Sequence, residues 1–192
     1  MCTKKLLKTK NDYRSYAKKI RQQLVIAEIS RVICAKIVDL EEYKAAKTVA
    51  GFYPFGSEID LRCLYTDSSK KFLLPRVIDE ENIEFYLFNE ETQLEKNKWG
   101  ILEPKPEQET AKIVPDIILI PALMVDKQGY RLGYGKGYYD RYLSKLPEHC
   151  LKILPVAEEL FVDSLPHDEH DVRVDIALTQ SNIYDFRLIP ST

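Results

Sequence analysis

The chain has 192 residues, a formal net charge of −2, 45% hydrophobic residues and 30% charged residues. This length and composition are typical of one globular domain, residues 1–192, and the near-neutral charge gives no general attraction to nucleic acid or to a membrane surface. No apolar run reaches the roughly 18–20 residues of a membrane-spanning helix, and no signal-like stretch follows the basic N-terminus. We therefore expect a cytoplasmic protein that is not secreted.

The four cysteines, Cys2, Cys34, Cys63 and Cys150, are scattered along the chain. They form no CxxC pair and no cluster with histidines at the spacing of a metal site. Free thiols in a reducing compartment are the expected state. The sequence therefore gives no indication of a zinc site or of a disulfide framework.

The first half of the chain begins with helical periodicity. Residues 12–25 and residues 29–38 both carry apolar residues at i, i+3 or i+4, and i+7, which predicts two amphipathic helices. Residues 48–53 are apolar and end at Pro54, which predicts a buried strand. Ser57 is a candidate N-cap for a third helix that begins near Glu58.

Two short strands and a long connection follow. Residues 71–74 predict a strand that ends before Pro75, and residues 83–88 predict another. Residues 89–115 are polar and contain three prolines, so they predict a long irregular connection, a type of segment that is often functional. Residues 117–120 are wholly apolar, which is typical of a central strand in a parallel sheet.

The last third of the chain continues the alternation of helix and strand. A helix is predicted over about 137–145, and strands over 153–157 and 174–178. Such alternation favours a three-layer α/β/α sandwich around a mostly parallel open sheet. Ligands of such sheets bind beyond the carboxyl ends of the strands, where the segment after residue 120 is expected to lie.

That segment is unusually rich in glycine and tyrosine. Four of the seven glycines lie within residues 129–137, and five of the twelve tyrosines lie within 130–142. Arg131 and Lys136 bring cationic donors that suit phosphate, and Asp140 brings a hard oxygen that suits Mg²⁺. The pattern predicts a site for an anionic ligand that contains a ring system. A plain structural turn is the alternative.

The glycines Gly133, Gly135 and Gly137 form a GxGxG pattern. This differs from the GxGxxG fingerprint of dinucleotide-binding folds. It also differs from the phosphate-binding loop GxxxxGK[ST], because Gly137 follows Lys136. The motif therefore does not require a Rossmann function.

Several charged residues allow two interpretations. Eight lysines and arginines lie between Lys4 and Arg21, against the single acid Asp12, and a solvated helix face is their usual explanation. Glu58 is either a first-turn acid or a carboxylate that binds a substrate amine.

Three further residues are equally open. Asp171 and Asp175 either serve solubility at a strand edge or bind a metal ion together with Asp140. Trp99, the only tryptophan, lies in the long polar connection and is either a core residue or a ligand contact.

Seven blocks of sequence, in order, resemble the 5-formyltetrahydrofolate cyclo-ligase family, also called the methenyltetrahydrofolate synthetases. The likeness extends from about residue 10 to residue 179, and the block RLGxGxGYYDR within it is highly specific. The blocks are Lys10-x-x-x-Arg14, Val49 to Asp60, Leu74-Pro75-Arg76-Val77, Trp99-Gly100-Ile101-Leu102-Glu103-Pro104, Pro115 to Asp126, Gly129 to Arg141, and His170-Asp171-Val172-Arg173-Val174-Asp175.

The resemblance implies a reaction and a fold. The family uses ATP to convert 5-formyltetrahydrofolate to 5,10-methenyltetrahydrofolate, with release of ADP and phosphate, through phosphorylation of the formyl oxygen and attack by N10. Mg²⁺ is the expected cofactor, and the expected fold is similar to that of ribose-5-phosphate isomerase and CoA-transferase-like proteins. We expect a monomer, and the preferred length of the folate's glutamate tail stays open.

The resemblance also implies roles for individual residues. Catalysis is assigned to Lys136, Arg131 and Tyr138, and Mg²⁺ binding to Asp140 and Asp175. ATP binding is assigned to Lys10, Arg14, Arg131, Leu132, Gly133, Tyr134, Gly135, Lys136, Gly137, Tyr138 and Tyr139. Folate binding is assigned to Tyr53, Glu58, Trp99, Tyr134, Gly135, Lys136, Gly137 and Tyr138. The remaining cations of the basic run, Lys18, Lys19 and Arg21, keep the interpretation of a solvated helix face.

The chain departs from the family pattern at Ala122, where glycine is usual, and at Val125, where an aromatic residue is common. Two other functions are possible interpretations of the sequence. A sugar-phosphate isomerase or CoA-transferase-like enzyme would share the fold but has no use for Lys10 and Arg14. A binding module without catalysis would keep the pocket but show no turnover.

Overall fold

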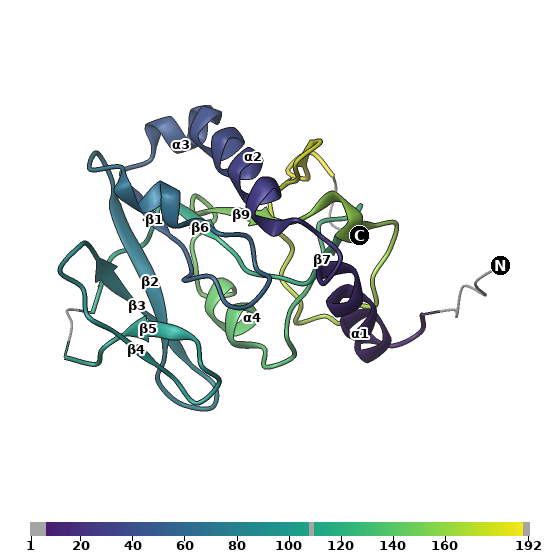
Figure 1. The fold of residues 1–192 in the computed structure, drawn as a ribbon, viewed down its shortest axis with the longest axis horizontal. Coiled ribbons are helices and arrows are strands. Elements are labelled where there is room, and N and C mark those ends of the chain that lie inside the picture. Colours follow the sequence, from purple (N-terminus) through teal and green to yellow (C-terminus); the bar gives the residue numbers. More distant parts are fainter. Residues whose placement is uncertain (1–6, 108–109, 190–192) are drawn as a thin grey trace.

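The computed structural model describes residues 7–107 and 110–189 (Figure 1). Cys2 and the first members of the basic run lie outside these ranges, whereas Cys34, Cys63 and Cys150 are free thiols, as predicted. The helices are α1 (Lys10–Arg21), α2 (Ile26–Asp39), α3 (Glu41–Ala45), the 3₁₀ helices η1 (Arg62–Thr66) and η2 (Glu158–Leu160), and α4 (Tyr138–Leu143). None of the helices in the described ranges is long and apolar enough to cross a membrane.

Helix α1 begins two residues before its predicted start. The Thr9 hydroxyl accepts a hydrogen bond from the Asp12 amide, and the Asp12 carboxylate accepts one from the Thr9 amide, which forms a capping box. This cap fixes the first turn of α1 and therefore the direction in which Lys10 and Arg14 leave the helix. Helix α2 agrees with its prediction, whereas the short α3 gave no separate signal in the sequence.

One large sheet carries the fold, with the strand order β12-β11-β9-β6-β1-β2-β3. The five inner strands β11, β9, β6, β1 and β2 are parallel, and the edge strands β12 and β3 are antiparallel to their neighbours. The sheet is therefore mostly parallel, as predicted, with residues 117–119 at its centre. The strands are β1 (Thr48–Ala50), β2 (Lys71–Val77), β3 (Ile83–Phe88), β6 (Ile117–Leu119), β9 (Leu151–Pro155), β11 (Ile176–Leu178) and β12 (Ile183–Asp185).

Strand β2 continues through Pro75, although the sequence predicted that it would end there. The Lys71 amide and the Leu73 carbonyl both bond toward β1, so the nitrogen of Pro75 faces the same side. Strand β1 pairs only as far as Leu73, and therefore the missing N–H of Pro75 costs no sheet hydrogen bond. The helix predicted to begin near Glu58 is wrong as well, because the first helical turn after β1 is η1 at Arg62.

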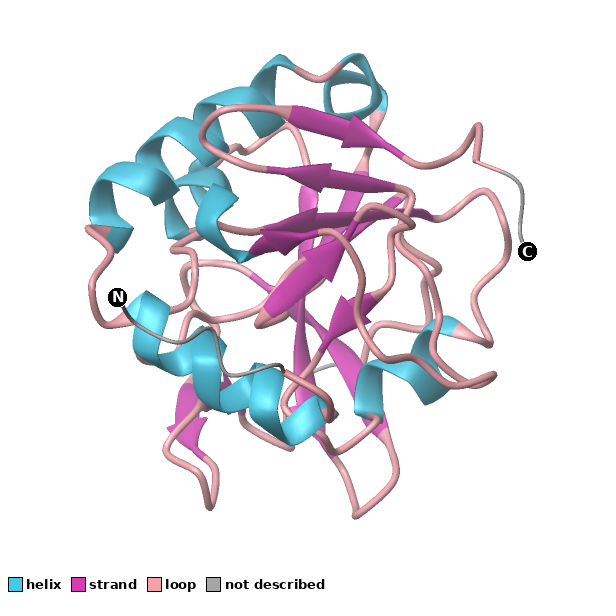
Figure 2. Cartoon of the chain, turned by 90° about the vertical axis from the view of Figure 1, so that its right-hand side faces the viewer, coloured by secondary structure: helices cyan, strands magenta, loops and turns pink. Residues whose placement is uncertain are grey.

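The sheet is covered on both faces (Figure 2). Tyr65 of η1 packs edge-on against Phe72 and Phe88, whereas Tyr142 of α4 packs against Phe85. Phe85 and Phe88 are three residues apart on one strand, so their side chains point to opposite faces. Helix α2 contacts η1, and α4 therefore lies on the other side, which agrees with a three-layer arrangement.

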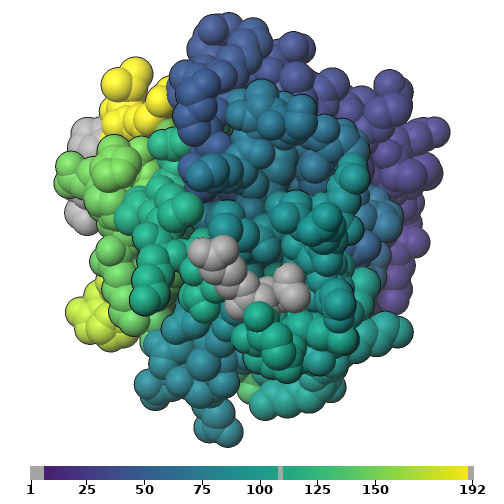
Figure 3. All heavy atoms as spheres, turned by 90° about the vertical axis from the view of Figure 1, so that its left-hand side faces the viewer, coloured from purple at the N-terminus to yellow at the C-terminus, as the bar shows by residue number. Residues whose placement is uncertain are grey.

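Two smaller sheets add to the frame. Strands β4 (Leu94–Lys96) and β5 (Leu102–Pro104) form a hairpin inside the connection that was predicted to be irregular. Strands β7 (Met124–Asp126), β8 (Arg131–Leu132) and β10 (Phe161–Val162) form the second small sheet. Figure 3 shows the segment of β2 to β5, in blue to teal, below the dark blue helices α2 and α3 on one face of the molecule.

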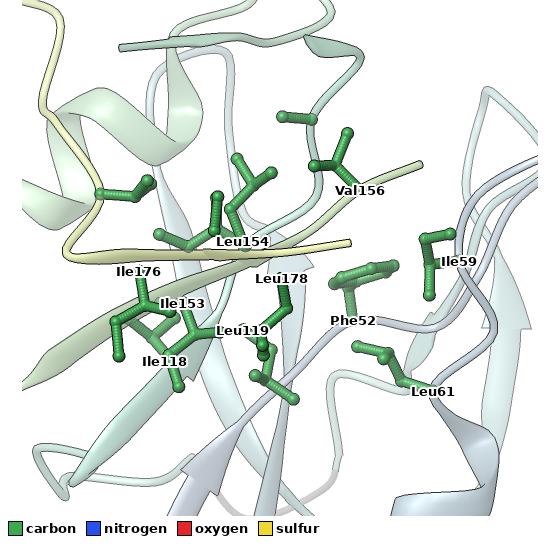
Figure 4. Packing of buried hydrophobic residues seen from close by; sticks show 14 of the residues in the cluster. Phe52, Ile59, Leu61, Ile118, Leu119, Ile153, Leu154, Val156, Ile176 and Leu178 are labelled. Atoms are coloured by element: carbon green, nitrogen blue, oxygen red, sulfur yellow. The ribbon is translucent and has the colours of Figure 1, made fainter. Parts of the chain in front are cut away.

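The core lies mainly on the parallel strands. Figure 4 shows Ile118, Ile153 and Ile176 close together on adjacent strands, and Phe52 and Leu61 in the same cluster. These side chains are almost fully buried, as expected for a sheet that is covered on both faces. The rigid core therefore ends where β1 and β6 end, and the segments that follow these two strands are held in place by it.

Candidate active site

A cleft opens beyond the carboxyl ends of β1 and β6. Phe52 and Tyr53, which follow β1, and Pro121, which follows β6, contribute to its wall. The cleft has a volume of about 530 Å³, which lies in the range of cofactor and substrate sites. Its position is the one that parallel α/β sheets use for ligands, as the sequence predicted.

Almost all of the predicted site residues meet in this cleft. They come from α1, from the segment after β1, from the β4–β5 hairpin and from the glycine-rich segment. The predicted residues that line the cleft are Lys10, Arg14, Tyr53, Glu58, Trp99, Arg131, Leu132, Gly133, Tyr134, Gly135, Lys136, Gly137, Tyr138, Tyr139 and Asp140.

Asp175 is the exception. It precedes β11 and accepts a hydrogen bond from the Lys152 amide at 2.7 Å, at the amino end of β9. The cleft lies at the carboxyl ends of the parallel strands, so Asp175 is at the opposite edge of the sheet. The structure therefore does not bring Asp175 to Asp140, where the resemblance had placed it, and Asp171 lines the cleft instead.

The glycine-rich segment needs glycine at two positions in the cleft. Gly135 has φ +100° and Gly137 has φ +69°, a region that other residues rarely adopt. A Cβ on Gly135 would also lie 3.1 Å from the Arg14 guanidinium carbon. Gly133 has open space around it, and Gly129 has φ +85° in the β7–β8 turn, outside the cleft lining.

Helix α1 brings two cations to this segment. The Arg14 Nε donates to the Gly133 carbonyl at 3.0 Å. The Lys10 ammonium lies 2.6 Å from carboxylate oxygens of both Asp168 and Asp171. Partial burial lowers the pKa of Lys10, but the two carboxylates outweigh this and hold that pKa above its ordinary value.

Arg131 and Asp140 form a partly buried ion pair. The Arg131 guanidinium donates to Asp140 Oδ1 at 2.7 Å and also to the Val172 carbonyl. The Val172 amide donates to the same Asp140 oxygen at 3.3 Å. The pair therefore joins β8, α4 and the 171–172 segment, and it fixes the position of the Asp140 carboxylate at the cleft.

Lys136 and Tyr138 also line the cleft. The Lys136 side chain is exposed, and no residue in the described ranges forms an ion pair with it. The Tyr138 hydroxyl donates to the Asp79 carbonyl at 3.2 Å, and its ring lies 6.4 Å from that of Trp99. Trp99 is 37% exposed, so it is a cleft residue and not a core residue.

Glu58 is buried against the glycine-rich segment. Its Oε1 accepts a hydrogen bond from the Tyr134 hydroxyl at 2.6 Å, and its Oε2 accepts one from the Phe55 amide at 2.9 Å. Burial raises the pKa of Glu58 above its ordinary value, although both hydrogen bonds and the charge of Arg21 act to lower it. An acid in this position presents an acceptor to any ligand that fills the apolar part of the cleft.

Three residues that the structure places in the cleft or next to it were not assigned to the site from the sequence. Arg21, expected on a solvated face, is only 6% exposed and donates to the Tyr134 hydroxyl at 2.8 Å. Glu103 lines the cleft, buried, with its carboxylate accepting from the Asn97 amide group at 2.7 Å. The sequence could not show which of Asp171 and Asp175 lies at the cleft, because the two differ only in the edge of the sheet at which the fold places them.

The comparisons with known proteins agree with one another. The model of the 5-formyltetrahydrofolate cyclo-ligase family matches residues 4–180. A Schizosaccharomyces pombe protein named "Probable 5-formyltetrahydrofolate cyclo-ligase" is 32% identical over 83% of this chain and 87% of its own length. The mouse 5-formyltetrahydrofolate cyclo-ligase is 28% identical over 88% and 87%.

A solved structure is similar as well. The 5,10-methenyltetrahydrofolate synthetase of Aquifex aeolicus has 32% sequence identity and a TM-score of 0.82, and the likeness covers 95% of each chain. The large, mostly parallel sheet is therefore shared with a protein of that name. The likeness to the isomerase and transferase fold stays a prediction.

Proposed function

This chain belongs to the 5-formyltetrahydrofolate cyclo-ligase family, and we propose that the cleft beyond β1 and β6 binds both substrates of that reaction side by side. The enzyme is an ATP-dependent ligase that converts 5-formyltetrahydrofolate to 5,10-methenyltetrahydrofolate. The observation that supports the site is the meeting of fifteen of the sixteen predicted residues in one cleft beyond the carboxyl ends of β1 and β6.

The reaction has two steps. The formyl oxygen attacks the γ-phosphorus of ATP, ADP leaves, and an iminium phosphate forms. N10 then attacks the iminium carbon, and phosphate leaves as the ring closes. Phosphoryl transfer demands positioning and charge neutralisation more than a nucleophilic side chain.

The phosphate side of the cleft is assigned to α1 and the glycine-rich segment. Arg14 lies against Gly133 and Gly135, and Lys10 projects from the same helix one turn earlier. Lys136, between Gly135 and Gly137, adds an exposed side chain. These three cations can surround the β- and γ-phosphates and stabilise the charge that moves between them.

The folate side of the cleft is assigned to the wall that follows β1. Phe52 and Phe55 give it apolar surface, and the Glu58 carboxylate adds an acceptor there. The N–H groups of a reduced pterin are donors, which suit that carboxylate. Trp99 and Tyr138 border the cleft and offer aromatic faces to the ring system of the folate.

Magnesium is expected to enter with ATP, and the residues present fit it. Asp140 and Asp171 both line the cleft, and one or two carboxylates together with substrate phosphates are the usual ligands of Mg²⁺. When bound, the ion would neutralise phosphate charge. Asp140 is held for this role by Arg131, which acts through that carboxylate and not on the substrate.

An absorbance time course tests the function. Purified protein is mixed with 5-formyltetrahydrofolate, with and without Mg-ATP, and the near-ultraviolet band of the methenyl product is followed. Growth of this band only with Mg-ATP is expected. A flat trace, with both ligands shown to bind by separate titration, would identify a binding module instead. The single-domain organisation, the monomeric state and the cytoplasmic location remain proposals that accompany this function.

A further inference from the structure

Arg21 is buried at the end of α1, where its neighbours Lys18 and Lys19 are exposed. Its guanidinium donates to the Ala122 carbonyl at 2.5 Å and to the Tyr134 hydroxyl at 2.8 Å. A buried charge of this kind is costly unless it is compensated. No carboxylate within the described ranges forms a direct ion pair with Arg21, so the compensating charge has to lie beyond one of these two partners.

The direction of the hydrogen bonds identifies that charge. Arginine has no acceptor, so the Tyr134 oxygen accepts from Arg21 and its single proton is left for another partner. That partner is Glu58 Oε1, at 2.6 Å. The buried cation and the buried carboxylate are therefore joined through one phenol, in the order Arg21, Tyr134, Glu58.

This chain of hydrogen bonds links helix α1 to the cleft wall that follows β1. Arg21 belongs to the helix that also carries Lys10 and Arg14, which were assigned to the phosphates of ATP. Glu58 belongs to the wall that was assigned to the folate. With Oε1 held by Tyr134 and Oε2 held by the Phe55 amide, the carboxylate has a single orientation, and each oxygen keeps a further lone pair for a ligand N–H.

We propose that Arg21 is a positioning residue for folate, which acts through the Tyr134 hydroxyl to orient the Glu58 carboxylate toward the pterin. Arg21 itself does not touch substrate. This inference rests on the proposed function in one respect, the assignment of Glu58 to the folate. It predicts that Arg21 and Tyr134 act as one unit, and that their loss affects folate more than nucleotide.

The test uses the fluorescence of Trp99, the only tryptophan, which lies in the cleft. The dissociation constant of 5-formyltetrahydrofolate is titrated without ATP, and that of a non-hydrolysable ATP analogue is titrated separately. The proteins are the wild type, Arg21→Met, Tyr134→Phe, the double variant, and Lys18→Met as the control from the exposed face of the same helix.

Each single variant is expected to weaken folate binding about tenfold, the effect of one lost hydrogen bond to a charged group. The double variant is expected to be no weaker than either single variant, because both remove the same interaction. Binding of the ATP analogue should change less than about twofold, because all variants keep the backbone and the ring at position 134, and Tyr134→Phe removes only the bonds of its hydroxyl to Arg21 and Glu58. Lys18→Met should match the wild type in both titrations.

Three outcomes would overturn the proposal. They are unchanged folate binding by Tyr134→Phe, losses that add in the double variant, or equal losses for folate and nucleotide. Tyr134→Phe removes only one hydroxyl from a half-exposed side chain, so it remains informative if Arg21→Met does not fold. Wild-type protein that binds folate but shows no turnover would contradict the proposed function and leave this test intact.

Discussion

The Lys10 ammonium lies 2.6 Å from Asp171 Oδ2, and Asp168 Oδ2 lies at an equal distance from the same ammonium. A cation assigned to ATP is therefore already neutralised by two carboxylates. ATP phosphates have to compete with these carboxylates for Lys10. The exposed Asp168 is the partner that can be removed without disturbing the cleft lining.

Asp168→Asn should lower the KM for ATP by about twofold to fivefold, the modest range expected for an exposed ion pair. Steady-state kinetics with varied ATP checks this, and the KM for folate should not change. Asp163→Asn removes an equal charge from an exposed residue outside the cleft and serves as the control. A rise in the KM for ATP would show that Asp168 helps to present Lys10.

Lys136→Ala should reduce kcat/KM by about ten- to a hundredfold, because a charged hydrogen bond is worth about 1.5–3 kcal/mol. The side chain is exposed, so the midpoint of thermal unfolding should be unchanged. Lys145→Ala, an exposed lysine that follows α4 and does not line the cleft, is the matched control. Wild-type turnover in Lys136→Ala would remove Lys136 from the catalytic assignment.

Gly135→Ala should raise the KM for ATP about tenfold or more. The new Cβ would lie 3.1 Å from the Arg14 guanidinium carbon, on a backbone with φ +100°, so both Arg14 and the segment have to shift. Gly133→Ala has no neighbour within 4 Å and should have little effect on the same KM. Similar kinetics for the two variants would contradict the role given to the Arg14 contact.

Glu58→Gln tests the buried carboxyl by its pH dependence. The folded-state pKa of Glu58 is raised, so the folded protein binds this proton more tightly than the unfolded chain does. The stability from this group is present below its ordinary pKa of 4.5 and is lost as the pH rises through the raised value. Glutamine does not ionise, so the variant avoids that loss.

The free energy of unfolding of Glu58→Gln, relative to the wild type, should therefore increase as the pH rises above the ordinary pKa of 4.5. Urea unfolding at several pH values measures this difference. Glu84→Gln, on an exposed position of β3, removes the same charge without burial and is the control. A difference in the free energy of unfolding that is constant with pH would show that burial does not raise the pKa of Glu58 in the folded protein.

Tyr43→Phe should stabilise the protein by about 1–3 kcal/mol, since the Tyr43 hydroxyl is buried and has no hydrogen-bond partner in the described ranges. Tyr65→Phe should destabilise it by about 1 kcal/mol, because the Tyr65 hydroxyl donates to the Phe52 carbonyl at 2.7 Å. Thermal and urea unfolding of both variants compare the two cases. Equal signs for the two substitutions would contradict this explanation.

The local signals in the sequence were sufficient for the helices α1, α2 and α4 and for the inner strands of the sheet. Periodicity and apolar runs are local properties, and the neighbours in the sheet do not override them here. The end of β2 was predicted wrongly at Pro75. A proline in a strand costs a hydrogen bond only where a neighbouring strand pairs with it, and the sequence around Pro75 does not show where β1 ends. The β4–β5 hairpin was missed because its strands are only three residues long.

The site was predictable where a motif fixed a residue, as in the glycine-rich segment. Asp171 and Asp175 could not be separated, because their difference is the edge of the sheet at which each lies. Arg21 could not be separated from Lys18 and Lys19, because its burial depends on Tyr134, more than a hundred residues further along the chain. In both cases the location of the side chain depends on contacts with residues that are distant in the sequence.

The position of α1 has a consequence for how the enzyme matures. Its contacts are with segments that are made late, since Arg14 bonds Gly133, Arg21 bonds Ala122 and Tyr134, and Lys10 bonds Asp168 and Asp171. Loop closure over such sequence separations is slow compared with local helix formation. Helix α1 is made before all of these partners and is thus among the last elements to dock, and a nascent chain acquires a complete cleft only after residue 171 has emerged.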